Sequence, residues 1–412
     1  MTGSEQNAVN VVAGTAQEES IDHDIHEPPK THRTPLPKVQ LFIVFMVQLA
    51  EPITGTVVYP FVNQFVRDTG ITRGDERKTG YYAGIIESSF FFAEAFTVFH
   101  WGRLSDKLGR RPVILLGPLG LTIATLSFGL SNNFWTLVVS RWMQGAFNGN
   151  IGVTKSVIGE ITDSTNVGDA FAIIPLMWSS GCTVGPIMGG LLSQPATTWP
   201  GLFGRIPFFH HYPYFLPCAV AALLASFTGL IAFIGLKETL PSALKKQKQQ
   251  PAASATPDST TSLLLASEDL SYGSSTSPST TETGVTQEEL HAPPAFKDLL
   301  IPEILLKLLV YAFVSFVDMS CQVLQPLVYS TSIANGGLGF DPYRIGTIMG
   351  TFGVINALAQ LLFLGRVIRK FGPTNVQKFA QFSFLTVLSL YPLLSFFAKR
   401  AGGADNVDDI LV

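Results

Sequence analysis

Nine apolar stretches dominate the chain, and each is long enough to cross a membrane as a helix. A hydrocarbon core about 30 Å thick requires about 20 apolar residues of helix. Charged residues make up only 14% of the sequence, whereas an ordinary soluble domain has about 25%. The sequence therefore predicts an all-α integral membrane protein whose spans lie at about residues 39–62, 80–101, 112–131, 134–157, 168–193, 212–236, 303–331, 343–365 and 376–398.

Two polar segments set the domain boundaries. Residues 1–37 are acidic and interrupted by proline, and they lack the apolar core of a signal peptide. Residues 242–296 are rich in serine, threonine, proline and glutamine, a composition that cannot bury a core. We expect a disordered tail at 1–37, a six-helix half at 38–241, a disordered linker at 242–296 and a three-helix block at 297–412.

The basic residues of the links between spans predict how the chain crosses the membrane. Alternate links, counted from the N-terminal tail, hold about twice as many lysines and arginines as the others. Basic residues collect on the cytosolic side of membrane proteins. We therefore expect a multi-pass protein with a cytosolic N-terminus, and the sequence leaves both the vacuolar and the plasma membrane open.

A compact charged motif, WGRLSDKLGRRP, joins the second and third spans. Its glycines, Gly102 and Gly109, permit a tight turn and a close approach of helices. The motif thus predicts a cytosolic turn in which two helices come close together.

The acid and cations of this motif have several candidate partners. Asp106 and Arg110 can pair with each other, or with an acid at the end of the fourth span, Glu160 or Asp163. A plain cytosolic anchor would also explain the cations. It would leave the position of Asp106, between the two glycines, unexplained.

Two sequence features of the first half recur in the second block. GRLSDKLGRRP at 102–112 aligns with GRVIRKFGP at 365–373, and each follows the second span of its block. Glu51 in the first span aligns with Asp318 in the seventh. Two blocks of equal topology predict a parallel repeat about an axis normal to the membrane, although short glycine-rich turns also match by chance.

Four acids, Glu51, Glu87, Glu94 and Asp318, lie inside apolar spans. A charged side chain that faced lipid at a helix centre would cost roughly 3 kcal/mol, so we expect these acids to face an interior cavity. Desolvation favours the protonated form of a carboxylate. Such an acid can take up a proton from one side of the membrane and release it to the other, or it can make a structural hydrogen bond to a neighbouring helix.

Three motifs, on three different spans, resemble one family of transporters. GRLSDKLGRRPVI at 102–114 resembles motif A of the major facilitator superfamily. RWMQGAFNG at 141–149 is similar to the fourth-helix motif, and GCTVGPIMGG at 181–190 is similar to the fifth-helix antiporter motif. Details such as GEITD resemble the drug:proton antiporter branch, particularly its zinc-induced facilitator-like members.

The resemblance implies a role for each set of residues. It implies a charge latch that steadies the outward-facing state, formed by Gly102, Asp106, Gly109, Arg110, Arg111, Glu160 and Asp163. It implies proton coupling at Arg141, beside Gln144 and Gly145 of the same motif; an outward-snorkelling side chain is the alternative for that arginine. It implies an antiporter gate, or a static kink, at Gly181, Gly185, Pro186, Gly189 and Gly190.

The fold implied by the resemblance is a major facilitator-type bundle with nine of the expected twelve transmembrane helices, hence a C-terminal truncation. The implied function is proton-coupled antiport of a small organic molecule or a metal chelator by alternating access. The proton-coupling residues would be Glu51, Arg141, Asp318, Glu87 and Glu94. A non-transporting receptor with this fold and an inactive truncated form are the alternatives.

The sequence favours neither an enzyme nor a nucleic-acid-binding protein. It contains no phosphate-binding glycine loop, no histidine and cysteine cluster with metal-ligand spacing and no nucleophile elbow. The net charge of −3 excludes a strongly basic surface for nucleic acid. We expect no cofactor and no metal site, and we expect the partners of a monomeric chain to be the lipid bilayer, a small-molecule substrate and protons.

Overall fold

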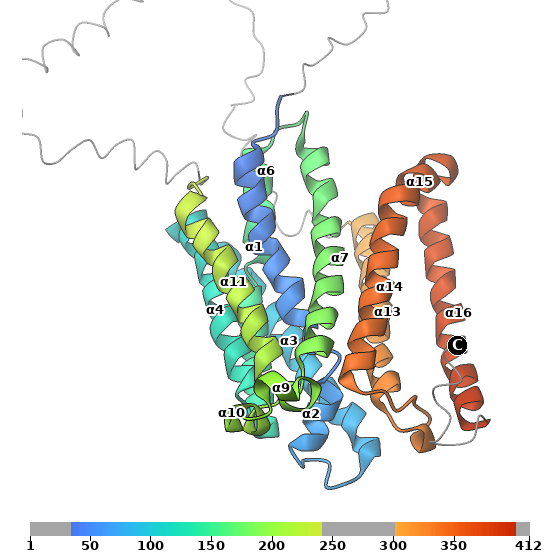
Figure 1. Cartoon of the computed structure of the whole chain (residues 1–412). Coiled ribbons are helices and arrows are strands. Elements are labelled where there is room, and N and C mark those ends of the chain that lie inside the picture. Colours follow the sequence, from blue (N-terminus) through green and yellow to red (C-terminus); the bar gives the residue numbers. More distant parts are fainter. Residues whose placement is uncertain (1–33, 241–300, 401–412) are drawn as a thin grey trace, which may run out of the picture.

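The computed structural model describes residues 34–240 and 301–400, and these residues form a bundle of long helices (Figure 1). The predicted linker at 242–296, and all but the last few residues of the predicted tail, lie outside the described residues. The first block, residues 34–240, contains α1 Lys38–Thr56, α2 Val62–Asp68, η1 Glu76–Lys78, α3 Thr79–Leu108, α4 Arg110–Gly129, α5 Phe134–Asn148, α6 Ile151–Ile161, α7 Val167–Leu192, α8 Pro195–Thr198, α9 Pro200–Phe203, α10 Pro207–His211 and α11 Phe215–Gly235. The second block, residues 301–400, contains α13 Pro302–Ser330, η4 Ile333–Asn335, α14 Pro342–Ala359, the π-helical turn η5 Gln360–Leu364, α15 Gly365–Phe371 and α16 Pro373–Arg400.

Eight helices in the described residues, rather than nine, are long and apolar enough to cross a membrane. The fourth apolar stretch divides into α5 and α6 at Gly149 and Asn150. Both of these residues keep right-handed helical dihedrals, so the two helices follow one kinked path. The break has a packing cause. A side chain at Gly149 would collide with Trp101, and the Asn150 amide fills the space beside Gly117 of α4.

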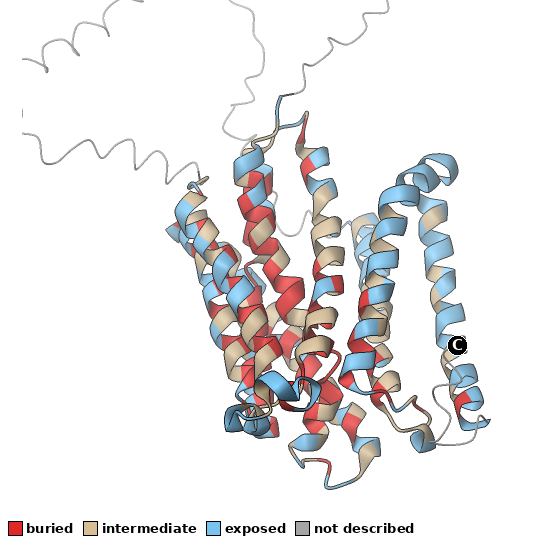
Figure 2. Cartoon of the chain, in the orientation of Figure 1, coloured by how far each residue is buried: buried red, intermediate tan, exposed pale blue. Residues whose placement is uncertain are grey.

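The buried interior of the first block (Figure 2) contains two apolar clusters, and buried polar residues such as Glu51 and Arg141 belong to neither. One cluster, around Phe61 and Phe128, lies at the end of the block that carries Glu76. The other, around Val44 and Ile114, lies at the end that carries Arg110. We call these the Glu76 end and the Arg110 end. Helix α1 passes through both clusters, and between them it contributes the buried polar residues Gln48, Glu51 and Thr54.

The two blocks meet at the Glu76 end, where the backbones of helices α7 and α14 touch at Gly190 and Gly346. A Cβ on Gly190 would lie 2.6 Å from the Cα of Gly346. Further along the two helices, towards the Arg110 end, Ile187 lies against Gly350 and Thr183 lies against Gly353. Small residues let helix backbones approach closely, and this contact stabilises membrane helices through van der Waals packing.

Hydrogen bonds add to this contact at the same end. The Ser332 hydroxyl donates to Glu76 Oε2 at 2.5 Å, and the Asn335 amide donates to the same oxygen at 2.9 Å. Towards the Arg110 end, most residues in the first turns of α7 are exposed or half-buried (Figure 2), and the buried one, Ala170, packs in the first block's own core. The blocks are therefore joined at one end and separate towards the other.

Cross-linking tests this arrangement of the blocks. In a background with Cys182, Cys218 and Cys321 replaced by serine, we expect Glu76→Cys with Ser332→Cys to form a disulfide under mild oxidation. Glu76→Cys with Glu303→Cys is the control. Position 303 is about 43 Å from position 332 along the α13 path at 1.5 Å per residue, so this pair should stay reduced.

A substitution at the glycine contact should weaken the same cross-link. Leucine at Gly346 would press against the α7 backbone at Gly190, so Gly346→Leu should lower the yield of the Glu76–Ser332 cross-link. An unchanged yield would contradict the close contact of α7 and α14.

Candidate functional site

Arg141 and Glu87 form a buried ion pair at the centre of the first block. The Nη2 atom of Arg141 lies 2.9 Å from both carboxylate oxygens of Glu87. The same nitrogen lies 2.9 Å from the carbonyl oxygen of Gly55, and the guanidinium lies 4.8 Å from the centre of the Phe90 ring. The side chain of Arg141 is 1% exposed and that of Glu87 is 5% exposed. The pair therefore ties α1, α3 and α5 together, and Arg141 does not snorkel outwards.

The other residues of the fourth-helix motif complete this contact. Gln144 accepts a hydrogen bond from Arg141 Nη1 at 2.8 Å and donates one to the hydroxyl of Thr125 in α4 at 2.9 Å. A Cβ on Gly145 would lie only 2.0 Å from the carbonyl oxygen of Phe90. Glycine at this position thus lets α5 approach the backbone of α3.

Glu51 and Glu94 form a second acidic site, with a different chemistry. Asn148 Nδ2 donates to Glu51 Oε1 at 2.8 Å and to Glu94 Oε1 at 3.1 Å. Glu51 is buried and Glu94 is half-buried. Within residues 34–240 and 301–400, neither carboxylate forms a salt bridge. Two carboxylates that share one amide donor repel each other unless one of them holds a proton.

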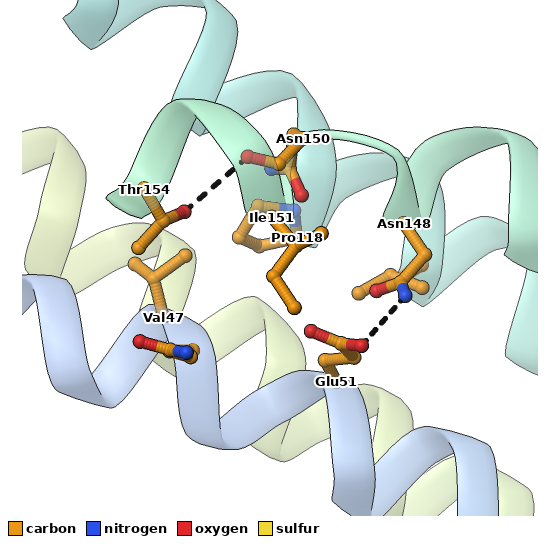
Figure 3. A pocket seen from close by; sticks show the side chains of 9 residues that line it. Val47, Glu51, Pro118, Asn148, Asn150, Ile151 and Thr154 are labelled. Atoms are coloured by element: carbon orange, nitrogen blue, oxygen red, sulfur yellow. Dashed lines mark hydrogen bonds between the residues drawn. The ribbon is translucent and has the colours of Figure 1, made fainter. Parts of the chain in front are cut away.

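A small cavity adjoins Glu51 on the side of the Arg110 end (Figure 3). Its volume is about 10 Å³, which is about the space that one water molecule requires. Its walls are Val47, Gln48, Glu51, Pro118, Leu121, Asn148, Asn150, Ile151 and Thr154. Gln48 is 8% exposed, and its side-chain oxygen has no hydrogen-bond partner among residues 34–240 and 301–400. This cavity therefore places an unsatisfied buried acceptor next to the Glu51 carboxylate.

Asp318, the counterpart of Glu51 in the repeat, is placed differently. It is half-buried in α13 of the second block. Its carboxylate accepts a hydrogen bond at 3.1 Å from Gln322 of the same helix. Among the described residues, Asp318 makes no hydrogen bond or salt bridge to Glu51, Glu94 or Asn148.

The charged motif after the second span is mostly helical. Helix α3 continues to Leu108, and Gly109 alone links it to α4, with φ of +103°. Space around Gly102 is open, since a Cβ there would have no neighbour within 4 Å. The close approach that we expected at Gly102 is therefore absent, and Gly109 alone makes the turn.

Arg110 is the centre of the predicted latch. Its guanidinium lies 2.8 Å from Asp106 Oδ1 and 2.9 Å from Glu160 Oε1. Arg111 instead donates to the carbonyl oxygen of Phe233 at 2.7 Å. The latch partners of Arg110 described here all belong to the first block, on α3 and α6.

Asp163 is not part of this network. It accepts hydrogen bonds from the backbone and hydroxyl of Thr165 at 2.8 and 2.6 Å, and from the hydroxyl of Thr34. These hydrogen bonds, with Thr165 contributing most, lower the pKa of Asp163. Of the two acids that follow the fourth span, Glu160 pairs with Arg110, whereas Asp163 joins the start of the described chain to the loop before α7.

Glu238, which our sequence reasoning missed, caps the N-terminus of α4. Its carboxylate accepts from the backbone N–H groups of Arg110 at 2.9 Å and Arg111 at 3.1 Å. Partial burial opposes ionisation, but backbone hydrogen bonds, including those from Thr239 and Leu240, outweigh it and lower the pKa of Glu238. A Cβ at Gly109 would lie 2.6 Å from Glu238 Oε2, so glycine is needed both for this contact and for the positive φ. An acid just after the sixth span was the available signal.

The predicted gate motif forms a small-residue stripe on α7. Cβ atoms on Gly181, Gly185 and Gly189 would lie 2.4, 2.1 and 2.0 Å from atoms of Pro52, Thr56 and Val57 in α1, respectively. Gly190 faces the other way, towards Gly346, and the carbonyl oxygen of Pro186 also lies against Gly346. The stripe therefore lets α7 pack tightly against α1 of its own block and α14 of the other.

The architecture and these motifs agree with comparison to known proteins. The Major Facilitator Superfamily model matches residues 43–404. The chain belongs to this superfamily. It is 35% identical over 390 residues to the major facilitator-type transporter psiT2 of Psilocybe cyanescens, covering 94% of this chain and 74% of that protein. It is 29% identical over 378 residues to Protein ZINC INDUCED FACILITATOR-LIKE 1 of Arabidopsis thaliana, covering 92% of this chain and 73% of that protein.

A solved structure supports the same fold. The crystal structure of a D-xylose-proton symporter superposes with a TM-score of 0.57 at 13% identity, covering 88% of this chain and 78% of that one. The predicted family and all-α membrane fold are thus confirmed. The chain is a multi-pass integral membrane protein of a family of small-molecule transporters rather than of enzymes.

The buried ion pair makes a prediction for stability. Glu87→Gln leaves Arg141 buried without its carboxylate, and removal of one partner of a buried pair costs about 3–5 kcal/mol. We expect a clear fall in the apparent melting temperature of the purified protein in detergent. Glu94→Gln is the matched control, because it removes an acid of the same helix that forms no salt bridge in the described part of the chain. Equal melting temperatures for the two variants would contradict the assignment.

The α4 cap makes a prediction for pH dependence. The pKa of Glu238 is lowered in the folded protein from an ordinary value of 4.5, so its charge stabilises the fold above that value. The stabilisation is lost as the pH falls through the lowered pKa. We expect the melting temperature of wild type to exceed that of Glu238→Gln at neutral pH, and the difference to shrink under acid conditions. A difference that is constant with pH would contradict the cap.

Proposed function

We propose that this protein exchanges protons for a small organic molecule or a metal chelator by alternating access. The observation that carries the proposal is the Glu51 and Glu94 site. Two carboxylates share one amide donor within the membrane-spanning bundle and form no salt bridge in the described chain. A site of this kind is neutralised by protons rather than by a side chain, so its charge can change during a transport cycle.

The contrast with Glu87 supports this choice of coupling acid. Arg141 lies 2.9 Å from Glu87. A neighbouring guanidinium favours the charged form of a carboxylate, so such a pair is balanced without a proton. In this proposal Arg141 and Glu87 hold α1, α3 and α5 in place, whereas Glu51 and Glu94 bind and release the proton. A cationic substrate close to these acids would favour release, which is the minimal requirement for antiport.

The small cavity would give a water molecule access to the Glu51 carboxylate. A water molecule there would hydrogen bond both to the side-chain oxygen of Gln48 and to Glu51. In the proposed orientation the Arg110 end and the N-terminus are cytosolic. The blocks join at the Glu76 end, so this arrangement corresponds to the state that is open to the cytosol.

The latch has a related role in this proposal. Asp106, Arg110 and Glu160 hold α3, α4 and α6 together while the Arg110 end is open. The latch therefore stiffens the first block, so that the block can rock as one body about the glycine contact with α14. This role differs from the outward-facing lock that the family resemblance implies.

Substrate-driven proton movement tests the proposal. Purified protein in proteoliposomes with an internal pH dye would be screened with organic cations and metal chelators, and the compound with the strongest response would be kept. We expect Glu51→Gln to abolish the proton movement while the protein still inserts into the membrane. Glu303→Gln, an exposed acid in the first turn of α13, is the control and should retain it.

Two results would contradict the proposal. Wild-type proton movement in Glu51→Gln would remove Glu51 from the mechanism. Binding of the compound by wild type without any proton movement or uptake would favour a receptor over an antiporter.

A further inference from the structure

A second feature of the first block lies outside the acidic site and the latch. It is an open groove of about 610 Å³ between the Arg110-end half of α3 and the outer face of α5. Its lining residues are Thr97, His100, Trp101, Arg103, Leu104, Lys107, Trp142, Met143, Ala146 and Phe147. The proposed antiport uses none of them.

The groove faces away from α1 and from the buried acids. Arg141 and Asn148 on α5 point towards α1, where they contact Gly55 and Glu51. Trp142, on another face of α5, is 44% exposed. In a membrane protein this outer face lies against lipid, so the groove opens to the bilayer rather than to a path through the protein.

The walls of the groove are apolar and aromatic. Trp101 donates from Nε1 to the carbonyl oxygen of Ala146 at 2.6 Å, which fixes its ring beside α5. The Phe147 ring centre lies 6.2 Å from that of Trp101 and Phe147 also packs on Gly120 of α4, so the floor is held from both sides. An acyl chain fits a lining of this kind, whereas a polar ligand would lose its water without compensation.

One rim of the groove is basic. His100, Arg103 and Lys107 are exposed and recur at helical spacing along α3, near its end. The neighbouring acid, Asp106, is engaged by Arg110 at 2.8 Å and does not neutralise this rim. Arg103 also lies over the Phe99 ring at 4.2 Å, which holds its guanidinium on the membrane-facing side of α3.

We propose that this groove binds one anionic phospholipid, with the phosphate headgroup on Arg103 and Lys107 and an acyl chain between Trp101 and Trp142. An apolar groove that ends in cations complements a lipid with a negative headgroup and an apolar tail. Anionic lipids are enriched in the cytoplasmic leaflet. The site therefore rests on the same cytosolic orientation of the Arg110 end as the antiport proposal, but it does not depend on proton coupling.

Native mass spectrometry of the full chain tests this site. The protein in uncharged detergent would be offered equal amounts of phosphatidylserine and phosphatidylcholine with identical acyl chains. Each basic residue near an anionic headgroup contributes about fivefold in binding. We therefore expect wild type to prefer phosphatidylserine, and Arg103→Gln with Lys107→Gln to lower that preference on the order of twentyfold.

A matched control separates the groove from general basic charge. Arg366 and Lys370 occupy the corresponding turn of the second block and are also exposed. Arg366→Gln with Lys370→Gln should leave the preference for phosphatidylserine unchanged. Equal losses for the two double variants would overturn the proposal, because they would show binding by net charge alone.

Two further measurements test the acyl part of the site and the fold. Glycerophosphoserine, which has the headgroup without acyl chains, should not displace the bound lipid at the same concentration; displacement would show an anion site and overturn the proposal. Trp142→Ala should weaken binding of both lipids together, and an unchanged affinity would remove the groove from the site. Wild-type melting temperatures for the variants in detergent would show that they are folded.

Discussion

The buried charges of the first block can be tolerated only because each acid has a different means of neutralisation. Glu87 forms an ion pair with the guanidinium of Arg141, at 2.9 Å, and the pair is buried between α1, α3 and α5. Among the described residues, the side-chain partner of both Glu51 and Glu94 is the amide of Asn148. Since a charge in the membrane interior is costly without a partner, this difference is the reason we propose Glu51 and Glu94, rather than Glu87, as the proton-binding acids. The rest of the architecture positions these two sites about two turns apart on α5, at Arg141 and Asn148.

Close backbone contact gives the bundle its other constraint. Where α7 meets α1 and α14, glycines replace side chains, and nothing larger fits without a shift of backbone or side chain. At Gly190 and Gly346 the two backbones meet directly, and further along the same contact Ile187 and Thr183 pack against glycines of α14. The join at the Glu76 end is thus suited to act as a pivot. At the Arg110 end, the latch and the Glu238 cap hold the helices of one block to each other rather than to the other block.

Much of this fold could be predicted from the sequence, because apolar length and motif spacing are local properties. The spans, the turn at Gly109 and the family were predicted in this way, whereas the glycines of α7 were interpreted as a gate or a kink and not as a packing stripe. The kink at Asn150 was not, because it depends on the space beside Gly117 in another helix. The extension of α3 to Leu108 was missed because its last turns are charged, and hydropathy marks the apolar core rather than the end of the helix.

The partners of the candidate site were harder to predict than its members. From the sequence we recognised Glu51, Glu87, Glu94 and Arg141 as candidates. The sequence did not show that Arg141 forms an ion pair with Glu87, which is 54 positions away. Gln48 and Glu238 were missed because an amide near a carboxylate, or a single acid after a span, has no distinctive pattern. In the sequence, Glu160 and Asp163 were equivalent candidates for the partner of Arg110. The path of the chain after α6 places Glu160 beside Arg110 and Asp163 beside Thr165.

Infrared difference spectroscopy on the protein in lipid, as a function of pH, tests the central claim most directly. A protonated carboxylic acid has a carbonyl stretch that a carboxylate lacks, and the measurement requires no knowledge of the substrate. We predict that wild type shows this band titrating in the membrane interior and that Glu51→Gln removes it. The band should survive substitution of the second-block acid, Asp318→Asn. A band that persists in Glu51→Gln would contradict the account, because the proton would then be held elsewhere.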